Sequence, residues 1–171
     1  YWNEHLREEF IFPSSQSDTI LLDSAWFKPG LNRGRLECFL PDGDTLNLKY
    51  DYFVEANDVS LVSTWDMLNV FQEWGDTERN KSVENNALTI KKETFRYGLG
   101  THASSKILLA IPEKIKGKPL HFFGEIGLDD ESVCGDGAFY EIFADGKRIY
   151  KSPRLYTEDR ISVQIEIPAS E

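Results

Sequence analysis

Short apolar runs, each closed by glycine, proline or polar residues, restrict the fold of this chain more than any other feature of its sequence. They cover residues 87–90, 106–111, 120–128 and 161–167. Runs of this length are typical of β-strands, and several at such spacing indicate an antiparallel sandwich or a barrel. We therefore expect an all-β fold, an antiparallel β-sandwich of the jelly-roll type with an extra hairpin region at its N-terminal end.

Two β-hairpins are predicted. In residues 35–54 the runs RLECFL and TLNLKYDYFV flank PDGD, and apolar and polar residues alternate from Leu46 to Tyr52. This alternation predicts a strand with one buried face. In the second hairpin, GAFYEIFA and KRIYKS are joined by Asp145-Gly146, a pair that tolerates the positive φ angles of a type I′ turn.

Helical periodicity is scarce, and we expect at most one or two short helices. The segment WDMLNVFQEW, residues 65–74, would place Met67, Val70, Phe71 and Trp74 on one side of a helix. This spacing predicts about two or three helical turns there.

The length of 171 residues, with 40% apolar residues, suits one domain, or one domain with an appendage. We place a boundary near Glu55–Ser60. Residues 1–58 would form a β-hairpin region or a fragment of a neighbouring domain, and residues 59–171 the sandwich. Because the chain starts at Tyr1 and its only methionine is Met67, we expect it to come from a larger or processed precursor.

The net charge disfavours polyanionic partners. Lys and Arg number 19 against 29 Asp and Glu, a formal net charge of −10, which would repel nucleic acid and anionic membrane surfaces. No stretch approaches the roughly 20 consecutive apolar residues of a membrane span. The opening YWNEHLREEF lacks the layout of a signal peptide.

The cysteines and histidines give no metal or disulfide framework. With only Cys38 and Cys134, one long-range disulfide and two free thiols both remain open. The three histidines, His5, His102 and His121, have no spacing to cysteine that suggests zinc.

The segment ETFRYGLGTHA, residues 93–103, carries the most distinctive motif. It resembles the NPCBM family, the carbohydrate-binding modules classed as family 51. The family pattern is Tyr, one or two residues, then Gly-hydrophobic-Gly-Thr-His-Ala, and here it runs from Tyr97 to Ala103.

Three further blocks resemble the family in the right order, so that the resemblance covers residues 60–167. They are EWGDTERNKSVENNALTI, FFGEIGLDDES and FYEIFADGKRIYKS, with matching positions at Trp74, Gly75, Ser82, Phe123, Gly127, Asp129, Asp130, Tyr140, Glu141, Ile142, Asp145, Gly146 and Lys147. The family's usual ending, similar to Asp-His-Ala-x-Trp, is not found, and residues 1–58 match nothing in it.

The resemblance implies a β-sandwich that binds sugars without catalysis. Such modules are commonly appended to secreted glycoside hydrolases that act on galactose-containing or blood-group-type glycans. We accordingly expect an extracellular or cell-surface location, a glycan partner with a galactose-type sugar favoured, and a tether to a larger polypeptide. The alternative is a protein-interaction or spacer module that binds no sugar.

A sugar ring presents an apolar face and a rim of hydroxyls, so its site needs an aromatic platform and a few fixed polar groups. Trp65, Trp74 and Tyr97 are the candidates for the platform. The candidates for the polar rim are His102, Asp129, Glu141 and Arg154. The competing interpretations are core packing for each tryptophan and, for His102, a buried imidazole that ties its loop to the backbone.

Other chemistries fit the residues poorly. Gly98–Gly100 lacks the third glycine and the following lysine of a phosphate loop. Asp130–Glu141 places Cys134 where an EF-hand needs oxygen, although a structural calcium held by carbonyls and carboxylates is left open beside a solvated turn. No nucleophile, base and orienting group can be assembled into a catalytic site, so we expect no enzyme activity.

Overall fold

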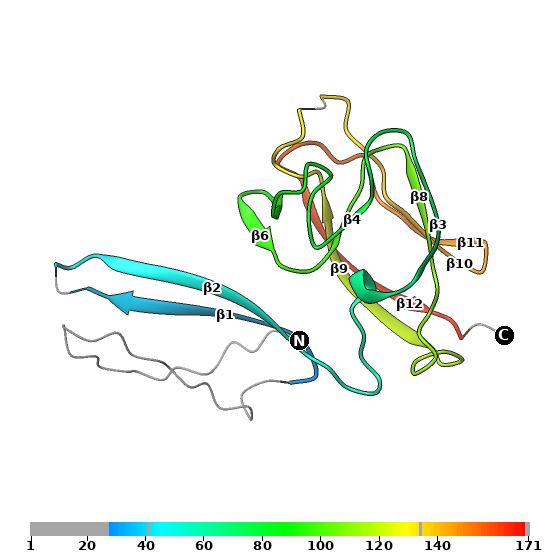
Figure 1. Ribbon diagram of the computed structural model, residues 1–171, viewed down its shortest axis with the longest axis horizontal. Coiled ribbons are helices and arrows are strands. Elements are labelled where there is room, and N and C mark those ends of the chain that lie inside the picture. The colour runs from blue at the N-terminus through cyan, green and yellow to red at the C-terminus, as the bar shows by residue number, and fades with distance from the viewer. Residues whose placement is uncertain (1–27, 41, 134, 170–171) are drawn as a thin grey trace. The chain divides into compact units, whose positions relative to one another are not determined.

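The computed structural model describes residues 28–40, 42–133 and 135–169, and these residues are almost entirely strand and loop (Figure 1). The chain divides into two compact units, Tyr1–Val59 and Ser60–Glu171. Among the described residues, no helix is long and apolar enough to cross a membrane.

The first unit contains the predicted hairpin. Strand β1 (Gly30–Phe39) pairs antiparallel with β2 (Thr45–Val54), in a register that runs without interruption along both strands. The turn is closed by two backbone hydrogen bonds, from the Leu40 N–H to the Asp44 carbonyl at 2.8 Å and from the Gly43 N–H to the Leu40 carbonyl at 3.0 Å. The prediction of this hairpin from PDGD is confirmed.

The predicted burial of one face of this hairpin is wrong. Leu46 and Leu48 are both 48% exposed, and Tyr50 and Tyr52 are exposed as well. The two described strands of this unit form a sheet by themselves, and a two-stranded sheet buries a face only when another layer covers it. Tyr50 does cover Gly34, because a Cβ on Gly34 would lie 1.9 Å from Cζ of Tyr50.

The second unit is an antiparallel β-sandwich, as predicted. One turn of 3-10 helix (Val62–Thr64) precedes ten strands. The antiparallel pairs are β3 (Met67–Gln72) with β8 (Ser105–Leu109), β4 (Glu78–Arg79) with β7 (Leu99–Gly100), β5 (Leu88–Ile90) with β6 (Glu93–Phe95), β9 (Leu120–Gly127) with β12 (Arg160–Ile167), and β10 (Glu141–Ala144) with β11 (Lys147–Lys151).

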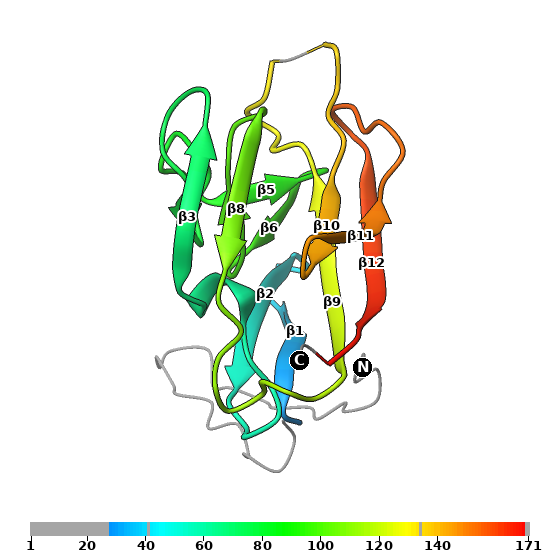
Figure 2. The same ribbon diagram turned by 90° about the vertical axis from the view of Figure 1, so that its right-hand side faces the viewer.

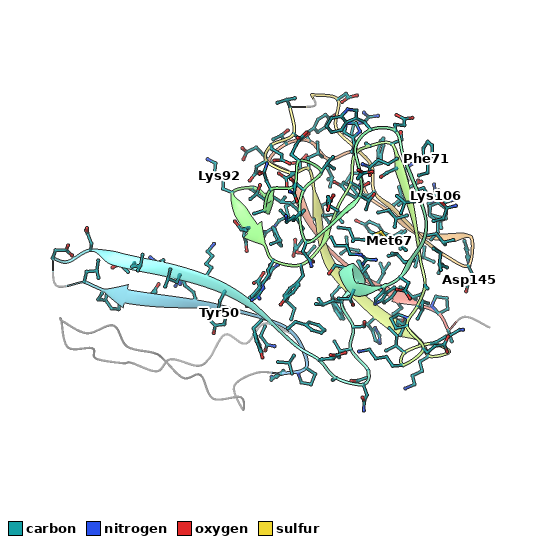
Figure 3. All side chains as sticks on the ribbon, viewed as in Figure 1. Tyr50, Met67, Phe71, Lys92, Lys106 and Asp145 are labelled. Atoms are coloured by element: carbon teal, nitrogen blue, oxygen red, sulfur yellow. The ribbon has the colours of Figure 1, made fainter. Side chains whose placement is uncertain are left out.

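The predicted short runs became these strands because alternate side chains face the interior. Along β12 the exposed fraction alternates, and Val163, opposite Gly124, is only 3% exposed. Phe95, Leu128 and Leu155 are buried with it. On the β3–β8 pair, Figure 3 shows Met67 pointing inward and Phe71 and Lys106 pointing outward.

The second predicted hairpin is confirmed in detail. Ala144 pairs with Lys147, which leaves Asp145 and Gly146 as a two-residue turn with φ angles of 47° and 77°. Both values are positive, as a type I′ turn requires.

The helix predicted for residues 65–74 is wrong. Residues 67–72 form strand β3, whose pairing with β8 has an irregular register between Met67 and Asn69. A short apolar segment can satisfy either period, and here the available partner strand at residues 105–109 decides in favour of a strand.

Several loops gather at one end of the sandwich, the upper end in Figures 1 and 2. Gln72 at the end of β3 pairs with Ser105 at the start of β8, so residues 73–77 and 101–104 lie side by side there. The loops after β9 and after β11 lie at this same end.

Candidate functional site

An exposed tryptophan and a histidine meet at this end. The Trp74 side chain is 55% exposed, and its ring centroid lies 5.3 Å from that of His102, with the two ring planes inclined at 58°. The interpretation of Trp74 as a core residue is therefore wrong. More than half of the residue is open to water, and an exposed indole is the condition for a sugar platform.

His102 does not tie its loop to the backbone through Nδ1. That nitrogen is buried and has no hydrogen-bond partner among the residues that the structure describes, while the residue as a whole is half-buried. A buried polar atom without a partner costs free energy unless something else satisfies it. Because Nδ1 is buried, only the exposed part of the His102 ring is available to a ligand beside Trp74.

Gln72 holds the two loops together. Its Nε2 donates to the Trp74 carbonyl at 2.7 Å, and its Oε1 accepts from the hydroxyls of Thr77 at 2.8 Å and Thr101 at 2.5 Å. The Glu73 N–H adds a bond to the Ser104 carbonyl at 3.1 Å. Sequence reasoning missed Gln72, although the threonine of the Gly-Thr-His motif was a signal for a partner of this kind.

The glycines of the motif allow close approach of a backbone segment at Gly100 and of a side chain at Gly98. A Cβ on Gly100 would lie 2.1 Å from the Lys81 carbonyl oxygen, and a Cβ on Gly98 would lie 2.8 Å from Cδ1 of Leu88. Gly75, directly after Trp74, has a φ of +68°. These positions require glycine for packing and turn geometry, which accounts for the motif without a phosphate.

Trp65 and Tyr97 are both half-buried. The indole N–H of Trp65 donates to the Ser60 hydroxyl at 3.0 Å, and Arg79 Nη2 donates to the Trp65 carbonyl at 2.6 Å. The Arg96 guanidinium lies 5.5 Å from the centroid of the Tyr97 ring. Neither ring is as open to water as that of Trp74.

The carboxylates of Asp129 and Asp130 hold the β5–β6 turn. Asp129 accepts from the Thr89 N–H at 2.9 Å, and Asp130 accepts from the N–H groups of Lys91 and Lys92 at 2.8 and 2.7 Å. Lys91 and Lys92 have positive φ angles of 55° and 62°, so this turn needs such support.

The same carboxylates bear on the prediction of a structural calcium ion. The carboxylates of Asp129 and Asp130 already accept backbone N–H groups, and the described residues include no group of three or more His, Cys, Asp or Glu placed to hold a metal. Structural calcium remains a prediction, which a comparison of melting temperatures in calcium and in EDTA would test. The interpretation of Cys38 and Cys134 lies outside what the structure describes of their side chains.

Glu141 and Arg154 have partners other than Trp74 and His102. Glu141 Oε1 lies 2.8 Å from Arg148 and 3.1 Å from Lys151, and the hydrogen bond from Lys151, followed by that from Arg148, lowers the pKa of Glu141. The Arg154 guanidinium lies 4.6 Å from the centre of the Phe139 ring. Of the seven predicted site residues, the structure thus shows ring contact between Trp74 and His102.

The NPCBM/NEW2 domain model matches residues 58–170. This chain belongs to the NPCBM/NEW2 family. The match covers the whole sandwich, so this part of the chain is a non-catalytic module of the carbohydrate-binding type, as the sequence motifs predicted.

The relatives of this NPCBM/NEW2 module are larger than the module itself. It is 31% identical over 105 residues to alpha-1,3-galactosidase B of Akkermansia muciniphila, a match that covers 61% of this chain and 13% of that protein. The chain thus spans about an eighth of the curated relative it matches.

Solved structures share the NPCBM/NEW2 fold. A CBM51 module from Clostridium perfringens GH95, in complex with methyl-galactose, has a TM-score of 0.54 at 23% identity and covers 64% of this chain and 79% of its own. The M60 catalytic domain of Clostridium perfringens ZmpB with its CBM51-1 and CBM51-2 domains has a TM-score of 0.56 at 16% identity. The match covers 82% of this chain and 15% of that chain. In that structure the catalytic domain is separate from the modules.

Proposed function

We propose that this module binds a terminal or accessible sugar, with a galactose-type sugar favoured, at the surface formed by Trp74 and His102. The single observation that carries the proposal is the exposed indole of Trp74 in contact with the His102 ring. The indole supplies the apolar platform, and the imidazole supplies a polar group at its edge.

The proteins to which this module is similar favour galactose as its ligand. The CBM51 structure from Clostridium perfringens GH95 holds methyl-galactose, and the Akkermansia relative is an alpha-1,3-galactosidase. A second similar structure, CBM51-2 of ZmpB, holds GlcNAc; it has a TM-score of 0.50 at 19% identity and covers 80% of this chain and 31% of its own. N-acetylglucosamine is therefore the comparison sugar.

The expected affinity is low. A platform that buries about 100 Å² contributes about 2.5 kcal/mol, and about three hydrogen bonds add about 3 kcal/mol. After ordering costs, the dissociation constant falls between roughly tens of micromolar and millimolar. Such affinity suits a module tethered to a larger secreted or cell-surface glycan-active protein, where tethering raises the effective sugar concentration.

Isothermal titration calorimetry with methyl-galactose and with N-acetylglucosamine at millimolar concentrations tests the proposal. We expect heat of binding with methyl-galactose that is lost in Trp74→Ala. A folded module that gives no heat with either sugar would instead support a spacer or protein-interaction role.

A further inference from the structure

A group of exposed cations surrounds one aromatic ring on hairpin β10–β11. Lys151 Nζ lies 4.8 Å, and the Arg154 guanidinium 4.6 Å, from the centre of the Phe139 ring. Arg148 and Lys151 both approach Oε1 of Glu141, at 2.8 and 3.1 Å. We call Phe139, Glu141, Arg148, Lys151 and Arg154 the basic hairpin cluster.

The cluster has an excess of positive charge on a strongly acidic chain. It contains three cations and one carboxylate, a local charge of 3 − 1 = +2, whereas the whole chain has a formal net charge of −10. Packing against the Phe139 ring and pairing with Glu141 hold the cations close together despite their mutual repulsion. A small anion placed among them would relieve that repulsion.

The cations are positioned yet accessible. The Arg148, Lys151 and Phe139 side chains are each roughly half exposed. Arg154 is held further by a hydrogen bond from Nη1 to the Asp136 carbonyl. A guanidinium and an ammonium held at a surface donate hydrogen bonds to the oxygens of sulfate and carboxylate groups.

Loops connect hairpin β10–β11, which carries the cluster, to the loop end of the sandwich. Glu141 opens β10 and pairs with Lys151 at the end of β11, and the chain enters and leaves this hairpin by the loops that gather at the upper end in Figures 1 and 2. Trp74 and His102 are carried by loops at that same end.

We propose that the basic hairpin cluster binds an anionic substituent of a glycan, a sulfate ester or a carboxylate. This inference rests on the proposed sugar-binding function and narrows the glycans to acidic ones. A polyanion such as nucleic acid is disfavoured, because its other charges would meet the net charge of the rest of the chain, −10 − 2 = −12. A single sulfate or carboxylate group is small enough to interact with the positive charge of the cluster alone.

The test compares three ligands by calorimetry on the whole chain: methyl-galactose, galactose 6-sulfate and galacturonic acid. We expect galactose 6-sulfate to bind about fivefold to tenfold more tightly than methyl-galactose at low salt, with the advantage shrinking as salt rises. The galacturonic acid arm decides whether a carboxylate serves as well as a sulfate.

The decisive variant is Arg148→Gln/Lys151→Gln. It should abolish the preference for the sulfated sugar and leave the affinity for methyl-galactose unchanged. The matched control is Lys116→Gln/Lys118→Gln, which removes the same charge from exposed positions in another loop and should keep the preference. Glu141→Gln should act in the opposite direction, because it removes the carboxylate that competes with the ligand.

The outcomes separate the two proposals. The anion site would be overturned if the wild type bound galactose 6-sulfate no more tightly than methyl-galactose. It would also be overturned if the double variant bound galactose 6-sulfate as tightly as the wild type does. Binding of the sulfated sugar alone would retain the anion site and refute the neutral-sugar site. Should the double variant fail to fold, the salt dependence of the wild type and the sign of the Glu141→Gln effect decide between the same outcomes.

Discussion

A Cβ atom on Gly100 would lie 2.1 Å from the carbonyl oxygen of Lys81 and 2.8 Å from Cα of Ser82. Strand β7 therefore lies directly against the backbone of Lys81–Ser82, and the chain continues from there into Thr101 and His102. The position of the histidine loop depends on this close approach.

The first prediction concerns Gly100→Ala. The added methyl group meets backbone atoms that have no rotamer to change, so we expect a loss of about 3 kcal/mol in the free energy of unfolding. Urea denaturation measures the loss. Gly135→Ala is the control, because a Cβ there meets nothing within 4 Å. Equal stability of both variants would show that the backbone at β7 yields easily.

The second prediction concerns Trp74→Ala. Removal of the platform should weaken methyl-galactose binding by about 2 kcal/mol, or about 30-fold, with little change in melting temperature because the indole is exposed. Phe71→Ala is the control, since Phe71 is also exposed but lies on the outer face of β3. A large fall in melting temperature for Trp74→Ala would contradict the exposed position.

The third prediction concerns His102→Ala. The loss of one sugar hydrogen bond should cost about 1 kcal/mol of binding free energy, measured by calorimetry in a folded protein. His121→Ala is the matched control, because His121 is exposed on β9, where its Nδ1 lies 3.9 Å from Glu166. Unchanged sugar affinity in His102→Ala would remove the imidazole from the site.

The fourth prediction concerns Asp130. Asp130→Ala removes the acceptor of two backbone N–H groups at residues with positive φ, so the free energy of unfolding should fall by about 2 kcal/mol. Asp130→Asn keeps one acceptor oxygen and should lose about half as much. Sugar affinity should stay constant in both, and a change in affinity with unchanged stability would assign Asp130 to the ligand instead.

The fifth prediction concerns Tyr140. Burial, with a smaller contribution from Asp129, raises the pKa of Tyr140 to about 12. The unfolded chain releases this proton near pH 10, so the stability that depends on neutral Tyr140 is complete below about pH 10 and is lost as the pH rises toward 12. The contribution reaches about 2 to 3 kcal/mol.

The measurement is the free energy of unfolding between about pH 9 and pH 12. Tyr140→Phe should show a shallower decline than the wild type, whereas Tyr156→Phe, at an exposed tyrosine, should follow the wild type. Parallel curves for wild type and Tyr140→Phe would mean that Tyr140 ionises normally in the fold.

The strands could be predicted because residues close in sequence determine where each strand begins and ends. Asp145-Gly146 specifies its turn through φ angles that few other pairs adopt, and the apolar runs end at residues that interrupt pairing. Residues 67–72 were misassigned because a short apolar segment fits both periods, and the choice depends on a partner strand far along the chain.

Burial and side-chain partners were harder to predict. Alternation along β2 shows that Leu46 and Leu48 share a face. The sequence of that strand does not show whether another layer covers this face, and the face is exposed. The role of Asp129 depends on Thr89, forty residues away in sequence, and a local motif contains no such information. Trp74 and His102 were found because two family motifs named them, whereas Gln72 looked like an ordinary polar residue in an apolar run.

The amide of Gln72 has a consequence for recognition. Because one side chain bonds both to the platform loop and to the histidine loop, the spacing of the two rings is set by folding. A ligand would meet a preorganised surface, and its arrival would require little loop rearrangement. Sugar preference could then change through side-chain replacement at the rim, with the scaffold beneath it undisturbed.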